Sequence, residues 1–187
     1  MCVITGEVGA GKSIILRYVA SKLHPSKYRT IPVIASTGST LEVLRQICVA
    51  LDTESRSNST ARLTKTIRSQ ILEISQRKQV PVLIIDEAGL LRYDVLAQIQ
   101  TIAQFEFDSK PLLTIIFAGQ NNLLDKFEYH TSKPMASRVV ARSHLGYSFE
   151  REPIRSADSS FVKSLYSQKS SLISPSSRNS FPIHHRE

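Results

Sequence analysis

Short apolar runs alternate with amphipathic stretches along the first 145 residues of the chain. Apolar runs of this length are typical of buried parallel strands, whereas apolar residues three or four positions apart indicate helices that pack on a sheet. The predicted strands cover residues 2–5, 31–35, 80–88 and 111–118, and the predicted helices cover 12–23, 40–51, 61–77 and 93–105. Because strands and helices alternate, the pattern predicts an α/β domain with a parallel sheet.

Two features refine the second strand and the helix that follows it. Pro32 has no N–H to donate to a neighbouring strand, so strand 31–35 is predicted at an edge of the sheet. Either Ser39 or Thr40 can cap the helix that runs to residue 51.

The pattern changes near Gly146. Residues 150–187 are rich in serine, contain no glycine and show no sustained periodicity, which predicts an irregular or disordered tail. We therefore divide the chain into a core over residues 1–149 and a tail over residues 150–187.

The clearest chemical signal is the glycine-rich segment between the first strand and the first helix. It reads G-x-x-x-x-G-K-S, the phosphate-binding loop or Walker A motif. The predicted nucleotide site consists of Gly6, Glu7, Val8, Gly9, Ala10, Gly11, Lys12, Ser13 and Ile14. Glycines let backbone N–H groups approach a phosphate closely, and the helix start adds the positive end of its dipole. The Lys12 ammonium can reach the β- and γ-phosphates of ATP, and the Ser13 hydroxyl can bind Mg²⁺.

A glycine turn without function is the alternative for this loop. It fits poorly, because the strand before the loop and the helix after it are the context that the motif requires.

The second signal is the apolar run from Val80 that ends in Asp86 and Glu87, the Walker B pattern. An apolar strand suits the centre of a sheet that is covered on both faces, and its carboxyl end faces the ligand crevice. We assign Asp86 to Mg²⁺ and Glu87 to the general base that activates water. The alternative is a strand that ends by chance in an acidic turn, and the preceding Walker A motif argues against it.

Two weaker signals follow strand 111–118. Gln120, or as a second choice Asn121, could position water against the γ-phosphate, although a helix cap or a turn explains either amide equally well. Arg138 and Arg142 lie four residues apart and so share a helical face. One interpretation is an arginine finger donated to the nucleotide of a neighbouring subunit, and the other is a surface helix with two solvated arginines.

Charge and composition narrow the class of protein only a little. The formal net charge of +8 is compatible with nucleic-acid binding, but the lysines and arginines are scattered along the sequence. No run is long and apolar enough to span a membrane, and no signal peptide is predicted. Cys2 and Cys48 fall in a predicted strand and a predicted helix, as expected of buried thiols in a cytoplasmic protein.

Together these segments resemble the AAA+ ATPases, and more closely the bacterial ExeA (general secretion pathway protein A) and TniB group of transposition-associated ATPases. The resemblance covers roughly residues 1–145 and rests on residues 5–13, 82–88, 117–120 and 136–138. It implies a three-layer P-loop NTPase fold with five parallel strands in the order 5-1-4-3-2. It also implies that Gln120 matches sensor 1 and that Arg138 matches the arginine finger. Members have a segment before the first strand and a helical lid after the core, so we expect a chain that is truncated at both ends.

The resemblance further implies a helper ATPase of DNA transposition or of secretion assembly, which binds and hydrolyses ATP with Mg²⁺. Its implied partners are duplex DNA bound without sequence preference, a transposase and further copies of the chain. A different hypothesis is an inert or regulatory fragment that binds nucleotide, because the tail shows no lid helices. A small-molecule kinase fits less well, since the adjacent carboxylates of Asp86 and Glu87 suit water activation. A helicase motor would need a second core domain.

Overall fold

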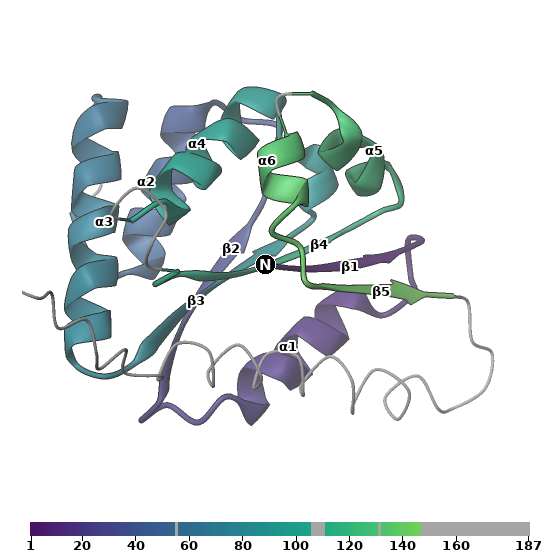
Figure 1. The fold of residues 1–187 in the computed structure, drawn as a ribbon, viewed down its shortest axis with the longest axis horizontal. Coiled ribbons are helices and arrows are strands. Elements are labelled where there is room, and N and C mark those ends of the chain that lie inside the picture. Colours follow the sequence, from purple (N-terminus) through teal and green to yellow (C-terminus); the bar gives the residue numbers. More distant parts are fainter. Residues whose placement is uncertain (55, 106–110, 131, 147–187) are drawn as a thin grey trace, which may run out of the picture.

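The computed structural model describes residues 1–54, 56–105, 111–130 and 132–146. Five strands form one parallel sheet (Figure 1): β1 (Cys2–Gly6), β2 (Tyr28–Ile34), β3 (Val80–Asp86), β4 (Thr114–Gly119) and β5 (Ala141–Leu145). The helices are α1 (Lys12–Lys22), α2 (Thr40–Ala50), α3 (Thr60–Gln76), the 3₁₀ turn η1 (Ala88–Leu90), α4 (Tyr93–Ala103), α5 (Asn122–Glu128) and α6 (Lys133–Ala136). The predicted tail over residues 150–187 lies outside the described residues, as do residues 147–149 at the end of the predicted core.

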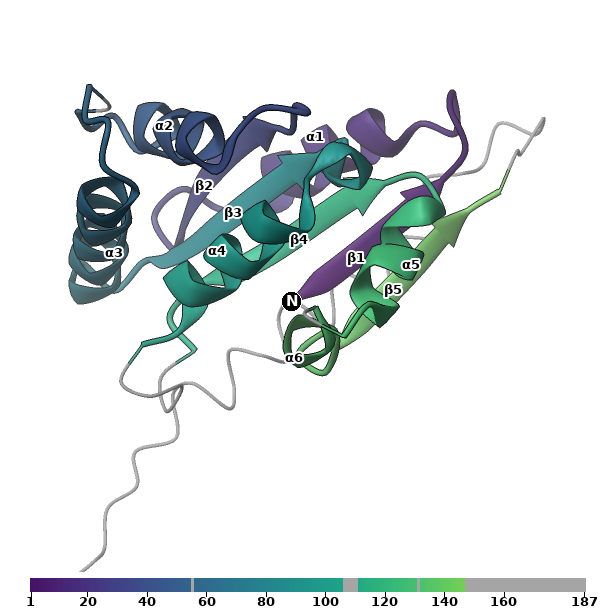
Figure 2. The ribbon, with the colours of Figure 1, turned by 90° about the horizontal axis from the view of Figure 1, so that it is seen from above.

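The strand order is β2-β3-β4-β1-β5, and Figure 2 shows the strands side by side in this order. The implied order 5-1-4-3-2 is therefore confirmed, and so is the edge position of the strand that contains Pro32. The Ala35 N–H donates to the Asp86 carbonyl, and the Val80 N–H donates to the Lys27 carbonyl. Odd-numbered residues of β2 thus form backbone hydrogen bonds with β3. Pro32 is even-numbered, so its nitrogen, which carries no hydrogen, faces the side of β2 that has no neighbouring strand.

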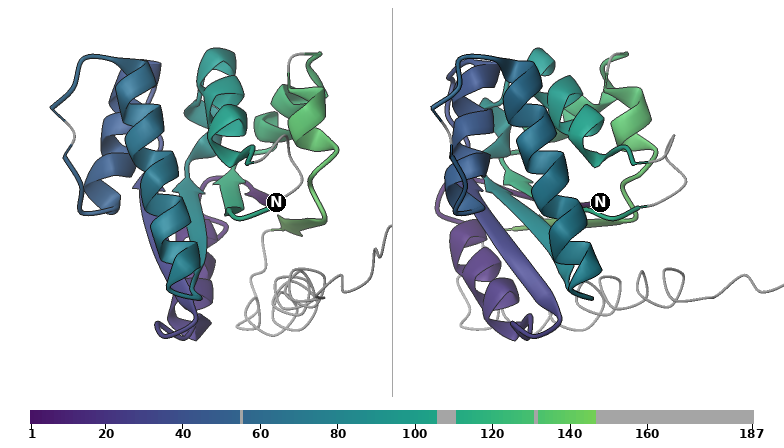
Figure 3. Two further views of the ribbon diagram at one scale, coloured as in Figure 1. Left: turned by 60° about the vertical axis from the view of Figure 1, so that its left-hand side comes forward. Right: turned by 90° about the vertical axis from the view of Figure 1, so that its left-hand side faces the viewer.

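Helices cover both faces of the sheet. Among the described residues, α1 packs on one face and α2 to α6 lie on the other, which the side views of Figure 3 show most plainly. Each face has its own buried apolar cluster. Cys2 belongs to the α1 side and Cys48 to the opposite side, and both are buried free thiols. This agrees with the prediction made from the sequence, and no described helix is long and apolar enough to cross a membrane.

The interpretation that Arg138 and Arg142 share a helical face is wrong. Helix α6 ends at Ala136, and Arg142 lies in β5, where it pairs with Val3 of β1. The backbone of Val140 has already left the helix, since its N–H donates to the Met1 carbonyl at 2.9 Å. Pairing with a buried strand outweighs the local spacing of the arginines, because β1 needs a hydrogen-bonding neighbour on each side.

Candidate functional site

The strand order brings the predicted site residues other than Arg138 to the carboxyl end of the sheet. The phosphate-binding loop follows β1, Asp86 and Glu87 end β3 or follow it, and Gln120 and Asn121 follow β4. Since β4 lies between β3 and β1 and all three strands are parallel, their carboxyl ends lie together at this edge. Ligands of open α/β sheets bind in such a crevice.

The loop from Gly6 to Gly11 has the backbone that its glycines allow. Gly9 and Gly11 have φ of 85° and 83°, a left-handed conformation that costs a non-glycine residue free energy. Gly6 meets the neighbouring strand, because a Cβ at this position would lie 2.8 Å from the Leu145 carbonyl oxygen. The Ile14 and Ile15 N–H groups bond to the Gly11 carbonyl, so α1 starts directly behind the loop.

Lys12 fills the loop with its own side chain. Its ammonium donates to the Gly6 carbonyl at 3.0 Å and to the Glu7 carbonyl at 2.8 Å, and the residue is 5% exposed. A buried cation needs such acceptors. Phosphate oxygens would be stronger partners than neutral carbonyls, so the side chain is placed to exchange one set of oxygens for the other.

Ser13 and Asp86 meet across the site. The Ser13 hydroxyl donates to the Asp86 carboxylate at 2.6 Å, which joins the start of α1 to the end of β3. A hydroxyl and a carboxylate in contact fit Mg²⁺, which prefers oxygen ligands and is commonly held by one or two carboxylates plus substrate phosphates. No group of three or more His, Cys, Asp or Glu side chains within the described residues is arranged to hold a metal alone.

Glu87 has an unusual backbone. Its φ of 53° places it in the left-handed region, where a residue with a side chain stores strain of about 1–3 kcal/mol. Its N–H donates to the Asp86 carboxylate at 2.9 Å. The Glu87 carboxylate is half-buried, and no described side chain is hydrogen-bonded to it. Such a carboxylate is available to accept a proton from water.

Of the two amides after β4, the structure brings Asn121 to the loop. The Asn121 side chain donates to the Glu7 carboxylate at 2.9 Å. Gln120 is exposed, and its side chain has no hydrogen-bond partner in the described part of the chain. Neither amide caps α5 through its side chain. The sensor role that we predicted for Gln120 stays a prediction.

Arg138 lies at the other end of the sheet. It precedes β5, whose first residue Ala141 pairs with Cys2 at the start of β1. The predicted phosphate-binding loop follows the opposite end of β1. The structure therefore does not bring Arg138 to the site of its own chain.

Lys126 lies beside this site, and the sequence does not single it out. Its ammonium donates to the carbonyls of Gly89 and Leu91, both at 2.6 Å, just beyond Glu87. Burial lowers the pKa of this ammonium. In the sequence Lys126 is one of 24 lysines and arginines, and no motif marks it.

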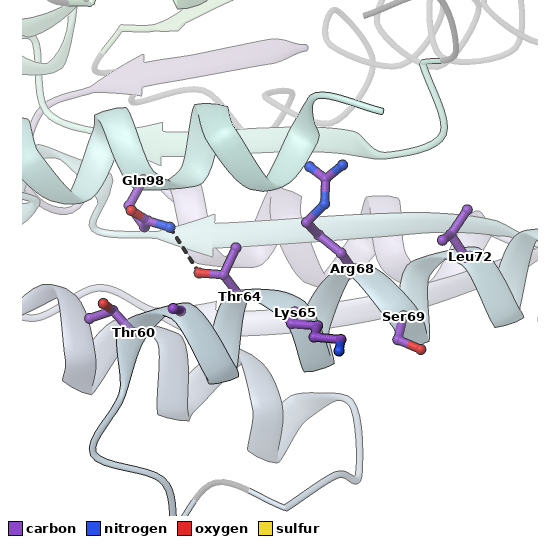
Figure 4. A pocket seen from close by; sticks show the side chains of 8 residues that line it. Thr60, Thr64, Lys65, Arg68, Ser69, Leu72 and Gln98 are labelled. Atoms are coloured by element: carbon purple, nitrogen blue, oxygen red, sulfur yellow. Dashed lines mark hydrogen bonds between the residues drawn. The ribbon is translucent and has the colours of Figure 1, made fainter. Parts of the chain in front are cut away.

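A second hollow lies on the helices, away from the predicted nucleotide site. This groove between α3 and α4 has a volume of about 670 Å³, and Figure 4 shows the side chains that line it. It is lined by Thr60, Ala61, Thr64, Lys65, Arg68, Ser69, Leu72 and Gln98. Gln98 donates to the Thr64 hydroxyl across it, and Arg68 donates to backbone carbonyls at the end of α4. Among the described residues, the lining thus combines two cations with hydroxyl groups and contains no carboxylate.

Comparison with known proteins places the chain among nucleotide-binding domains. A family model described as AAA domain matches residues 1–127. General secretion pathway protein A of Aeromonas hydrophila is 27% identical over 143 residues, which are 76% of this chain and 26% of that protein. The chain therefore spans about a quarter of the length of this curated relative.

Solved structures share the fold at low sequence identity. Cdc6p from Pyrobaculum aerophilum matches 77% of this chain and 38% of its own, with a TM-score of 0.58 and 16% identity. The ORC2 protein of Aeropyrum pernix in its ADP form matches 78% and 42%, with a TM-score of 0.60 and 13% identity. The ORC1 protein of the same organism, solved in complex with DNA, matches 77% and 38%, with a TM-score of 0.55 and 15% identity.

Replacement of Lys12 by alanine is expected to abolish ATP binding, because it removes the cation enclosed by the loop. Calorimetric titration with ATP measures the effect, and Lys27→Ala, which removes an exposed lysine at the other end of the sheet, is the matched control. Equal ATP affinity in Lys12→Ala and the unmodified protein would refute the assignment of the loop.

Proposed function

This chain belongs to the AAA domain family, and we propose that it binds ATP together with Mg²⁺ and hydrolyses the nucleotide. The observation that carries the proposal is the contact between Ser13 and Asp86 at 2.6 Å, with Lys12 and Glu87 as their chain neighbours. Two oxygen donors, one buried cation and one unpartnered carboxylate then occupy one edge of the sheet. Phosphoryl transfer to water needs this set of groups.

Each residue has a distinct task in the proposed reaction. Backbone N–H groups of the loop and the Lys12 ammonium bind the β- and γ-phosphates, and Ser13 and Asp86 hold Mg²⁺. When bound, Mg²⁺ neutralises charge that develops on the phosphate oxygens. Glu87 takes a proton from the attacking water as the bond between the β- and γ-phosphates breaks, which leaves ADP and inorganic phosphate. Gln120 or Asn121 orients this water.

We propose that the ATPase acts as a helper in DNA transposition or in secretion assembly, with a transposase or a secretion component as its protein partner. The likeness to the ExeA and TniB group supports this role, as does the 27% identity to general secretion pathway protein A. The chain spans only 26% of that protein. The proposed role is therefore inferred from similarity in the ATPase core alone.

Arg138 is proposed to act on the nucleotide of a neighbouring copy of the chain. The support is its position at the edge of the sheet opposite its own nucleotide site, where it cannot serve that site. The same position favours a second function for the isolated chain, a regulatory module that binds nucleotide with no turnover of its own.

Duplex DNA is the proposed nucleic-acid partner. Support comes from the net charge of +8 and from the groove between α3 and α4, where the exposed Lys65 lies among hydroxyl groups (Figure 4). Phosphates bind such a surface without reading the bases.

Glu87→Gln is expected to retain ATP binding and to lose turnover by about 10²–10⁴-fold, since the amide keeps the shape and loses the base. The measurements are phosphate release at saturating ATP and ATP affinity by titration. Unchanged turnover in this variant, with a measurable rate in the unmodified protein, would place the base elsewhere. No turnover by the unmodified protein at any concentration would favour the regulatory module.

Arg138→Ala is expected to bind ATP normally and to lose the rise of specific activity with protein concentration, because a finger in trans can contribute roughly 10³–10⁵ in rate. A mixture with Lys12→Ala tests the direction of this action. One variant keeps a nucleotide site and the other keeps the arginine, so mixed assemblies should recover activity that neither shows alone. The contrary outcome is an active unmodified protein and a mixture that stays inactive despite measurable co-assembly. That result would indicate that Arg138 is an ordinary surface arginine.

DNA binding is expected to be independent of sequence and to weaken steeply with salt, with a log–log slope of about −0.9 for each phosphate neutralised. Lys65→Ala should reduce this slope by about one unit, whereas Lys27→Ala should leave it unchanged. Fluorescence anisotropy with labelled duplexes at several salt concentrations gives the slopes. Affinity that holds constant across salt would exclude phosphate contacts, and equal slopes for the two variants would exclude the groove between α3 and α4.

A further inference from the structure

The Lys126 ammonium is hydrogen-bonded to a single turn of the backbone. It lies on α5, which follows β4, and its ammonium donates at 2.6 Å to the carbonyls of Gly89 and Leu91. The same ammonium is 5.9 Å from the centre of the Tyr93 ring at the start of α4. A half-buried lysine with two short bonds to one turn differs from the exposed lysines that water solvates.

The turn to which Lys126 is hydrogen-bonded directly follows Glu87 in the chain. The Leu90 N–H donates to the Glu87 carbonyl at 2.9 Å, and the Leu91 N–H donates to the Ala88 carbonyl at 3.1 Å. These two bonds form the single turn η1, which starts directly after Glu87. A 3₁₀ turn of this length has little stability of its own. The carbonyls at its end, which have no partner within the turn, are those that Lys126 binds.

The left-handed backbone of Glu87 needs support from its surroundings. A residue at φ of 53° keeps this strained conformation only where neighbouring structure determines it. Two glycines show that η1 packs closely against its neighbours. A Cβ at Gly119 would lie 2.9 Å from the Gly89 nitrogen, and a Cβ at Gly89 would lie 2.7 Å from the Asn122 side-chain oxygen. The end of β4 and the start of α5 thus support the turn by contact, and Lys126 adds charged hydrogen bonds.

We propose that Lys126 is a positioning residue, which holds η1 and thereby keeps the Glu87 carboxylate aimed at the carboxyl edge of the sheet. This inference rests on the proposed ATP hydrolysis, in which Glu87 is the base. Lys126 itself touches neither nucleotide nor water in the reaction. Its effect should therefore appear in the chemical step and leave the binding of ATP unchanged.

The test compares Lys126→Met with Lys27→Met in the full chain. Methionine keeps the apolar stem and loses the donors, and each variant removes one lysine charge. We expect Lys126→Met to lower kcat by roughly one to two orders of magnitude, as for a catalytic group displaced by about 1 Å, with KM and ATP affinity unchanged. Lys27→Met should keep the kcat of the unmodified protein.

A double variant separates positioning from general stability. If Lys126 acts through Glu87, then Lys126→Met should lower turnover no further in a Glu87→Gln background, because the group that it positions is already lost. An equal loss in both backgrounds would overturn the proposal. So would a fall in ATP affinity that parallels the fall in kcat, since that pattern indicates a structural role.

Amide hydrogen exchange tests the geometry without turnover. The Leu90 and Leu91 amides should exchange faster in Lys126→Met than in Lys27→Met, while amides of β2 and α2 keep their rates. If the unmodified protein fails to hydrolyse ATP, the proposed function fails, and this measurement still reports whether Lys126 holds the turn. Unchanged exchange at Leu90 and Leu91 would overturn the positioning role by itself.

Discussion

Parallel pairing of β1 between β4 and β5 is the constraint on which the rest of the structure depends. Every residue of β1 is buried, so its backbone groups must be satisfied by neighbours on both sides. The pairing with β4 places the glycine loop beside the segment that follows β4, and β3 comes next in the sheet. The contact of Ser13 with Asp86 follows from this order, since residues 73 positions apart meet only through the sheet.

Electrostatics within the loop complement this geometry. The Lys12 ammonium is buried against two backbone carbonyls, so the loop carries a desolvated positive charge next to glycine N–H groups. A polyphosphate bound as we propose would replace these neutral acceptors with charged ones. Binding energy of this kind also stabilises the fold, because a ligand that binds only the folded state shifts the folding equilibrium toward it.

Local patterns in the sequence predict those parts of the fold and site that depend on neighbours in the chain. The apolar run from Val80, the glycine spacing before Lys12 and the missing N–H of Pro32 each act locally. Strand β3 and helix α1 begin where the pattern indicates, but β3 ends at Asp86 rather than at residue 88, and β2 covers Tyr28–Ile34 rather than residues 31–35. The strand order came from the resemblance. The spacing of Arg138 and Arg142 predicts a shared helical face wrongly, because the place of Arg142 in β5 depends on β1, far away in the sequence. For the same reason the bonds of Asn121 to Glu7 and of Lys126 to η1 are invisible in the sequence: they join surface-type residues whose partners are fixed only by the sheet.

The position of Arg138 limits how copies of this chain can act on one another. Its own phosphate-binding loop lies at the carboxyl edge of the sheet, and Arg138 lies at the amino-terminal edge beside the start of β1. If Arg138 serves a neighbour, the amino-terminal edge of one sheet must face the carboxyl edge of the next. Where each copy contributes only one of these edges, two different surfaces meet and the contact is heterologous. Contacts of this type propagate, and they close into a ring or continue as a helical filament according to the rotation between copies. A two-fold dimer could therefore bring both arginines to nucleotide sites only through an interface that includes both edges of each sheet.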